Sequence, residues 1–199
     1  AFAQEYTTPL LSNPRNDKNL FLKNKSSVLL PFFDDFSSFD RSSTNWIGKS
    51  TYINANYPLN PPTLGVVTFD GLDSSGYAYD INMTNNSGLA DELLSQEINL
   101  SSSDTAFLLF YYQPQGYGDN PQVEDSLVLE FLSDSAGVKS WNRVWSVPGN
   151  SLHEFKKVVL LIYDPVFLHN SFQFRFKNYA TLSGNFDHWH LDYIKLDNF

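Results

Sequence analysis

The sequence predicts an all-β domain, a two-sheet antiparallel β-sandwich of the jelly-roll type. Phe, Tyr and Trp make up 16% of the 199 residues, and aromatic side chains favour the pleated, half-buried surface of a sheet. About eleven short apolar segments follow one another along the chain at near-regular spacing, as in sandwich folds. No segment shows a convincing amphipathic helix longer than two turns.

Clusters of Gly, Pro, Asn, Asp and Ser separate the predicted strands, for example at residues 60–62, 116–122 and 182–185. Residues 90–100 also have helical features, but their neighbours favour a strand. The predicted strands are residues 28–36, 46–54, 65–70, 76–81, 93–100, 106–113, 126–133, 141–147, 155–163, 171–179 and 189–196.

A period of two is clearest in two of these strands, where alternate apolar residues share one face. They are Phe172, Phe174 and Phe176 in one strand, and Leu127, Leu129 and Phe131 in the other.

Composition excludes several functional classes. The net charge of −9 argues against nucleic acid as a ligand, because phosphate binding needs a basic face. The chain has no cysteine, so it has neither disulfides nor thiolate metal sites. No apolar run reaches 18 residues, and we therefore expect no membrane-spanning helix.

The first residues, Ala1-Phe2-Ala3-Gln4, match the end of a secretory signal peptide, with Gln4 as the first mature residue. We therefore predict export to the periplasm, the outer-membrane surface or the medium. An exported chain without cysteine favours a bacterial source. The expected organisation is a residual cleavage site over 1–3, an extended lead-in over 4–27 and one sandwich domain over 28–199.

Several motifs resemble a known family. PFFDDFSSFDRSSTNWI is followed, in order, by LADELLSQEINL, AFLLFYYQPQG, DSLVLEF, WNRVWSVPGN, FKKVVLLI, SFQFRFKNY and HWHLDYIKL. This order resembles the MAM domain, a jelly roll related to the concanavalin-like and carbohydrate-binding sandwiches, although the cysteines typical of MAM domains are missing.

A narrower resemblance rests on NPPTLGVVTFDGLDSSGYAYD, YYQPQGYGDNP and FDHWHLDYIKL. Together they look like a group of exported Bacteroidota proteins found in bacteria with type IX secretion and cell-surface machinery. The resemblance covers about residues 30–197. It implies a jelly roll located at the cell envelope or surface, and it does not specify a function.

Two histidines near the end of the sequence are candidate zinc ligands. On a strand, His188, His190 and Asp192 would share a face opposite Trp189, Leu191 and Tyr193. Alternate residues lie roughly 6.5–7 Å apart, and two imidazoles at that spacing can reach one zinc ion. Because no third ligand is evident, we favour hydrogen bonding across the sheet and keep zinc as the alternative.

The resemblance also implies a structural calcium ion. In carbohydrate-binding and MAM-like jelly rolls, an acidic residue of the last strand often meets one of the first strand at calcium. Here these residues are Asp192 and the pair Asp34 and Asp35, with Asp70 or Asp80 as further ligands, and calcium prefers such oxygen ligands. In the alternative interpretation, the aspartates cap turns and remain solvated.

The longest segment without strand character, residues 113–125, is a candidate ligand-binding loop. Its Tyr117 lies between two glycines, and Asp119 offers a hydrogen-bond acceptor, a combination that suits a sugar or a protein partner. Trp141 and Trp145 are further candidates, of which one is expected in the core and the other on the surface.

These observations favour a non-catalytic binding or structural module that binds a protein partner at the cell envelope. A carbohydrate-binding module is the second hypothesis, and a coplanar pair of exposed aromatic rings would favour it, whereas a flat apolar patch along one sheet would favour a protein partner. A metal-dependent hydrolase is third, because the sequence contains no complete catalytic motif and no carboxylate pair with glycosidase spacing.

Overall fold

The computed structural model describes residues 12–13, 27–38, 45–47, 50–82 and 87–198. The predicted cleavage site over 1–3 and almost all of the predicted lead-in over 4–27 lie outside the described residues. In the part of the chain that is described, no helix is long and apolar enough to cross a membrane.

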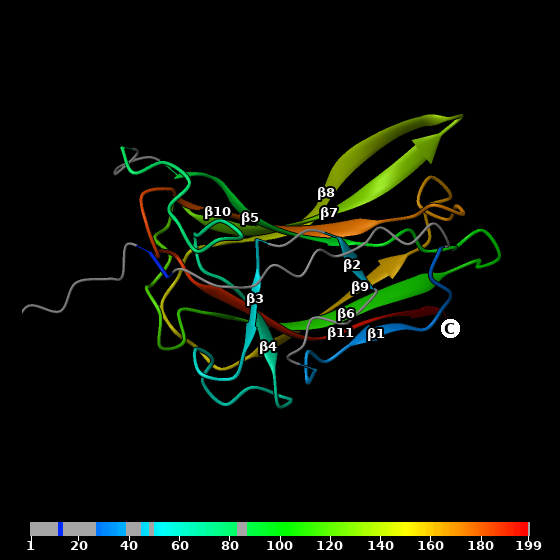
Figure 1. Cartoon of the computed structure of the whole chain (residues 1–199). Coiled ribbons are helices and arrows are strands. Elements are labelled where there is room, and N and C mark those ends of the chain that lie inside the picture. The colour runs from blue at the N-terminus through cyan, green and yellow to red at the C-terminus, as the bar shows by residue number, and fades with distance from the viewer. Residues whose placement is uncertain (1–11, 14–26, 39–44, 48–49, 83–86, 199) are drawn as a thin grey trace, which may run out of the picture.

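Antiparallel strands form two sheets, which lie one above the other in Figure 1, so the predicted sandwich is confirmed. In the first sheet the order is β3-β4-β11-β6-β9, and β1 also pairs with β11; in the second it is β2-β5-β10-β7-β8. The bounds are β1 Phe32–Asp34, β2 Trp46–Ile47, β3 Tyr52–Asn54, β4 Val66–Phe69, β5 Ser87–Ser95, β6 Ala106–Pro114, β7 Ser126–Ser135, β8 Val138–Pro148, β9 Lys156–Ile162, β10 Phe174–Thr181 and β11 Trp189–Asn198.

The core lies between the sheets and follows the predicted alternation. Phe174 and Phe176 of β10 are fully buried, and Phe172 just before the strand is buried with them. Leu127, Leu129 and Phe131 of β7 are also buried. Burial of large aromatic side chains provides much of the hydrophobic free energy of such a fold. We call the opposite side of each sheet, turned away from the core, its outer face.

Two predicted strands are corrected by the structure. The segment 46–54 is not one strand, because β2 and β3 belong to different sheets and the chain crosses between them. The segment 76–81 is not a strand either: its Ala78 makes only an isolated bridge with Leu72. Asp73 holds this segment as a turn, because its carboxylate accepts hydrogen bonds from the backbone N–H groups of Ser75 and Tyr77.

The loop over residues 55–65, between β3 and β4, contacts side chains of the first sheet's outer face. Gln113 of β6 accepts a hydrogen bond from the Leu59 N–H at 2.8 Å and donates one to the Leu59 carbonyl oxygen at 2.9 Å. Thr63 makes two hydrogen bonds to Asp192 of β11. The loop therefore covers the outer face at these residues, which explains why polar Gln113 and Asp192 are buried.

A β-bulge in β11 changes which face its later residues occupy. The register with β6 shifts between Asp192 and Lys195, and Tyr193 has a φ of 51°. Tyr193 is therefore not on the core face with Trp189 and Leu191, as alternation predicted; it contacts Tyr111 on the outer face instead.

Candidate functional site

His190 is a buried hydrogen-bonding residue of the first sheet. Its Nδ1 lies 2.8 Å from the Thr68 hydroxyl, and its Nε2 lies 3.1 Å from the Gln115 carbonyl oxygen. A carbonyl oxygen only accepts, so Nε2 carries the proton and Nδ1 accepts from Thr68. Burial lowers the pKa of His190 to about 4, which keeps the ring neutral. Both ring nitrogens are thus occupied by protein partners.

His188 lies before the first residue of β11 and makes different contacts. Its Nδ1 accepts a hydrogen bond from the Asp119 N–H at 2.9 Å, and its ring stacks on Tyr57, with centroids 5.2 Å apart. His190 contacts the 113–125 loop, whereas His188 contacts that loop and also Tyr57 of the 55–65 loop. Among the described residues, no group of three or more His, Asp or Glu side chains is placed to hold a metal ion. These contacts favour the hydrogen-bonding interpretation over zinc.

The glycines beside Tyr117 are explained by the same histidines. A Cβ at Gly116 would collide with the Tyr57 carbonyl oxygen and the His190 ring, and one at Gly118 would collide with the His188 ring. Only glycine lets the chain pass this close. The motif QPQGYGD therefore packs a turn against two buried imidazoles.

The predicted calcium ligands are only partly brought together. Asp34 accepts hydrogen bonds from the Trp46 indole N–H at 2.8 Å and from the Phe36 N–H. Asp192 accepts from the Thr63 hydroxyl at 2.7 Å, and that hydroxyl lies 2.8 Å from the Asp35 carbonyl oxygen. Asp35 and Asp192 therefore lie on either side of Thr63. Calcium at these residues stays a prediction.

Asp70 and Asp80, the further ligands predicted for calcium, have other roles. Asp70 is buried beside Asp91, whose pKa is raised well above its usual range by burial and by Asp70. Asp91 accepts hydrogen bonds from the Gly71 N–H and from the Tyr79 hydroxyl. Asp80 accepts from the Asn82 N–H in a turn. A sequence does not show that distant acidic residues share one buried region.

A second group of acidic residues lies where the 113–125 loop meets the segment before β11. Burial, followed by the nearby Asp125 carboxylate, raises the pKa of Asp187 to about 7. Burial and Asp125 also raise the pKa of Asp119. Asp187 accepts from the Thr181 N–H at 2.7 Å, whereas its Oδ1 is buried without a hydrogen-bond partner. The carboxylates therefore repel one another, and half-buried Asp119 is part of this group. Its contact with a ligand stays a prediction.

Tyr117 is 74% exposed at the tip of its turn. Its backbone N–H donates to the Tyr57 carbonyl oxygen, and the turn has left-handed residues at Gln115 and Gly116. The ring is thus presented by a well-held turn, but no second exposed aromatic ring of the described chain contacts it.

Trp141 and Trp145, both on β8, face opposite sides of the second sheet. Trp145 packs toward the core, with its ring 5.1 Å from Phe110 and 5.2 Å from Tyr112. Trp141 lies on the outer face, where the Arg175 guanidinium carbon stands 4.1 Å from its ring centroid.

Arg175 is fixed in this position by two carboxylates. Its Nε donates to Glu130 at 2.7 Å, and its Nη1 donates to Glu92 at 3.1 Å. The side chains of Arg175 and Glu130 are only 19% and 14% exposed. We call Trp141, Arg175, Glu92 and Glu130 the Trp141 platform. It presents one aromatic ring beside fixed donors and acceptors, and no coplanar pair of exposed rings.

An apolar stripe crosses the outer face of the first sheet beyond the 55–65 loop. We define it as Phe33, Phe107, Leu109, Val159 and Leu161. Cross-strand pairing places Leu109 directly beside Val159, and Phe107 beside Leu161. Lys195 separates Phe33 from Leu109 in the same row. Phe33, Val159 and Leu161 are 40%, 48% and 59% exposed. In β6 the stripe residues alternate with buried ones, and in β9 they alternate with half-buried Val158 and Leu160.

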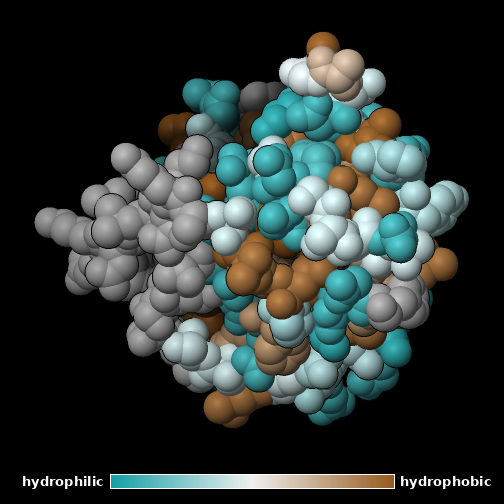
Figure 2. Space-filling view, turned by 90° about the vertical axis from the view of Figure 1, so that its right-hand side faces the viewer, coloured by the Kyte–Doolittle hydropathy of each residue, from teal (hydrophilic) through white to brown (hydrophobic). Residues whose placement is uncertain are grey.

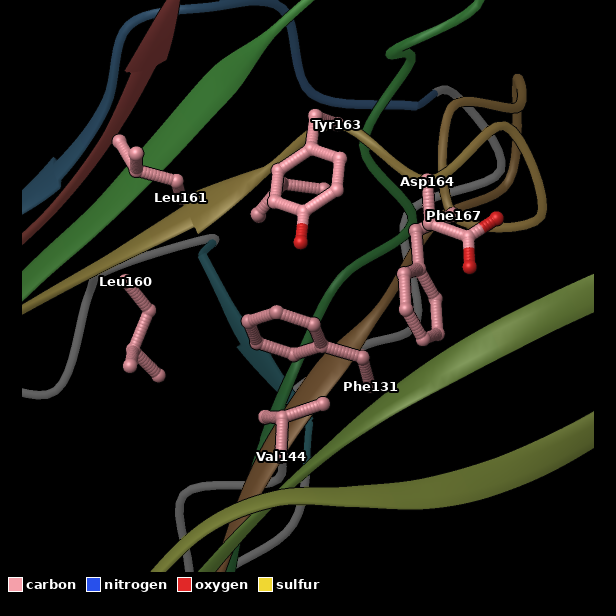
Figure 3. A pocket seen from close by; sticks show the side chains of 8 residues that line it. Phe131, Val144, Leu160, Leu161, Tyr163, Asp164 and Phe167 are labelled. Carbon is pink, nitrogen blue, oxygen red and sulfur yellow. The ribbon is translucent and has the colours of Figure 1, made fainter.

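An apolar pocket of about 230 Å³ lies beside the stripe, between β9 and the second sheet (Figure 3). Its lining residues come from β7, β8, β9 and the segment after β9. They are Phe131, Val144, Leu160, Leu161, Ile162, Tyr163, Asp164 and Phe167.

No family model and no curated protein matches this sequence. Solved structures with a similar fold include a family 16 carbohydrate-binding module (TM-score 0.46, 10% identity, 76% of this chain and 89% of that chain). The K1 cleaved adhesin domain of Lys-gingipain from Porphyromonas gingivalis W83 is similar at a TM-score of 0.47 and 10% identity (85% and 98% of the chains). TmCBM61 in complex with β-1,4-galactotriose is similar at a TM-score of 0.46 and 16% identity, over 92% of this chain and 100% of that chain. At these values the similarities carry no information about a ligand.

Proposed function

We propose that this protein is a non-catalytic binding module of an exported bacterial protein, which binds a protein partner at the cell envelope or surface through the apolar stripe. One observation carries the proposal: Phe33, Val159 and Leu161 are exposed in line with half-buried Leu109 and Phe107 on a single sheet face. Contiguous exposed apolar side chains typically mark interaction sites.

The surroundings of the stripe support this function. Tyr193 stands edge-on to Phe33 with centroids 4.9 Å apart, and Lys195 lies 5.7 Å from the Phe107 ring centroid. Aromatic and apolar side chains with a charged group among them, here Lys195 between Phe33 and Leu109, also occur in protein interfaces. The rigid sheet beneath it presents these side chains without a change in the backbone.

Site-specific photo-cross-linking in producing cells tests the proposal. A photoreactive phenylalanine analogue is placed at Phe33 or, separately, at Leu109, with Tyr77 as the control position because it is 53% exposed and lies outside the stripe. We expect protein adducts of defined mass from the stripe positions and none from Tyr77. Equal labelling at all three positions, or none at any, contradicts the proposal.

A glycan is the second candidate ligand, favoured by the Trp141 platform. A sugar ring can stack on an aromatic face while fixed charged groups bind its hydroxyls. Trp141→Ala should then abolish retention on a glycan array, whereas Tyr77→Ala should not. If the array shows no binding by the unmodified protein at all, this candidate is rejected.

A further inference from the structure

Strand β9 forms one edge of the first sheet. It pairs with β6 over Lys156–Ile162, and in the described part of the chain no strand pairs with its other side. An edge strand offers a row of backbone donors and acceptors to another strand. In Figure 1 the β7–β8 hairpin rises away from β9, so it does not cover this edge.

The sequence around β9 is complementary to itself in the antiparallel direction. Residues 156–164 read KKVVLLIYD, with Leu160 at the centre. When Leu160 is placed opposite Leu160 of a second copy, Lys156 faces Asp164. In the same register Lys157 faces Tyr163, and Val159 faces Leu161.

We infer that β9 pairs with β9 of a second copy of this chain, antiparallel, with Leu160 on the two-fold axis. Such a contact is isologous, so each favourable pair occurs twice. The two Lys156–Asp164 pairs place opposite charges near the ends of the ladder, which favours cross-strand pairing. Asp164 lies two residues beyond β9, in a turn where its carboxylate accepts from the Val166 N–H.

Neighbouring registers are less favourable. A two-fold axis perpendicular to the sheet requires that residues on the same face of the sheet lie opposite each other. The axis therefore passes through a residue, and moving it by one residue along β9 shifts the pairing by two residues. Centring the ladder on Val159 places Glu154 against Asp164, two like charges. Centring it on Leu161 places Asp164 opposite apolar Val158. Only the Leu160 register pairs both terminal charges with their opposites.

The Leu160 register also brings together the apolar stripes and the pockets of the two copies. The exposed side chains of Val159 and Leu161 meet their counterparts, so the apolar stripe continues across the axis. Lys157 of one copy stands opposite Tyr163 of the other, a favourable cation–aromatic pair. On the inner side, Leu160 lines the pocket (Figure 3). In this register we expect the second copy's Leu160 to approach it.

The right-hand side of the molecule in Figure 1 is seen face-on in Figure 2. Figure 2 shows hydrophobic side chains gathered in the middle of the face, with hydrophilic ones around them. Tyr163 at the end of β9 is 70% exposed. Pairing would bury part of the exposed Val159, Leu161 and Tyr163 side chains, while the flanking lysines and Asp164 remain at the border.

The absence of cysteine gives a test without background. Leu160→Cys places the two introduced thiols opposite each other in this register. We expect mild oxidation to produce a disulfide-linked dimer of twice 22.7 kDa, much faster than for Val138→Cys on the β7–β8 hairpin. Val138 is 70% exposed whereas Leu160 is half-buried, so random collision alone would favour the control. Equal rates for the two variants overturn the inference.

Charge reversal tests the register without altering the core. Lys156→Glu and Asp164→Lys should each weaken dimerisation roughly tenfold in analytical ultracentrifugation, and the double variant should restore it. A monomer at all concentrations, or a double variant as weak as the single ones, contradicts the inference. Unchanged circular dichroism spectra establish that the variants are folded. A monomeric result leaves the proposed partner at the stripe unaffected, because photo-cross-linking measures that separately.

Discussion

Replacing Asp187 by asparagine is expected to stabilise the fold above neutral pH. Asp187 is fully buried, and burial together with the Asp125 carboxylate raises its pKa from 3.8 to about 7. Asparagine removes the charge and keeps an acceptor for the Thr181 N–H. It also tolerates the left-handed φ of 59° at this position.

The sign and size follow from proton linkage. The folded state keeps the Asp187 proton up to about pH 7, whereas the unfolded state releases it near 3.8. The free energy of unfolding therefore falls as pH rises between these values. The full difference corresponds to about 4 kcal/mol, of which roughly 2–3 kcal/mol belongs to the interval from pH 5 to pH 8. Because Asp119 and Asp125 share the repulsion, we expect about 1–3 kcal/mol.

Urea unfolding at pH 5 and pH 8 measures this effect. Asp187→Asn should gain stability over the unmodified protein mainly at pH 8. His190 has the opposite effect on stability. Its pKa is lowered from 6.5 to about 4 in the folded state, so the free energy of unfolding falls as pH falls from 6.5 towards 4. Since both proteins contain His190, the difference between them isolates Asp187. Asp104→Asn, at an exposed position, is the control. A gain of equal size at both pH values would refute the reasoning.

Three further perturbations address the covering loops and the predicted metal. Thr63→Val should cost about 1–3 kcal/mol in the free energy of unfolding, because buried Asp192 loses a donor, while Thr63→Ser should retain most of the stability. Gly118→Ala should cost about 1–3 kcal/mol, because its Cβ would meet the His188 ring; an unchanged urea midpoint would show that the turn can move. The calcium predicted at Asp34, Asp35 and Asp192 should appear as one ion per chain by mass spectrometry, and EDTA should lower the melting temperature. Calcium-free protein of unchanged stability rejects that site.

The sandwich could be predicted because its signals are local. Alternation in β7 and β10 is visible within eight residues, and burial of Phe174 and Leu129 follows from it. The roles of His190 and Asp192 could not be predicted in the same way. Their partners, Thr68 and Thr63, lie 122 and 129 residues away in the sequence. The H-x-H pattern marks both positions as polar, but only the loops that cover it show why.

The apolar stripe could not be predicted from the sequence of β9 alone. Val159 and Leu161 alternate with Val158 and Leu160 in an entirely apolar run, so the pattern itself does not show which residues face the core. The neighbouring strand β6 resolves the ambiguity, but its pairing with β9 spans the whole of β7 and β8. The bulge at Tyr193 was equally invisible, since one residue in a left-handed conformation changes the face of its neighbours.

The position of β11 within the first sheet has a consequence for biosynthesis. This strand pairs with β1, β4 and β6, yet it is formed by residues 189–198, which leave the ribosome after all three partners. Until then these partners lack a common neighbour, and their edges are exposed to other chains. Closure of the sandwich therefore follows synthesis of the last strand instead of accompanying it.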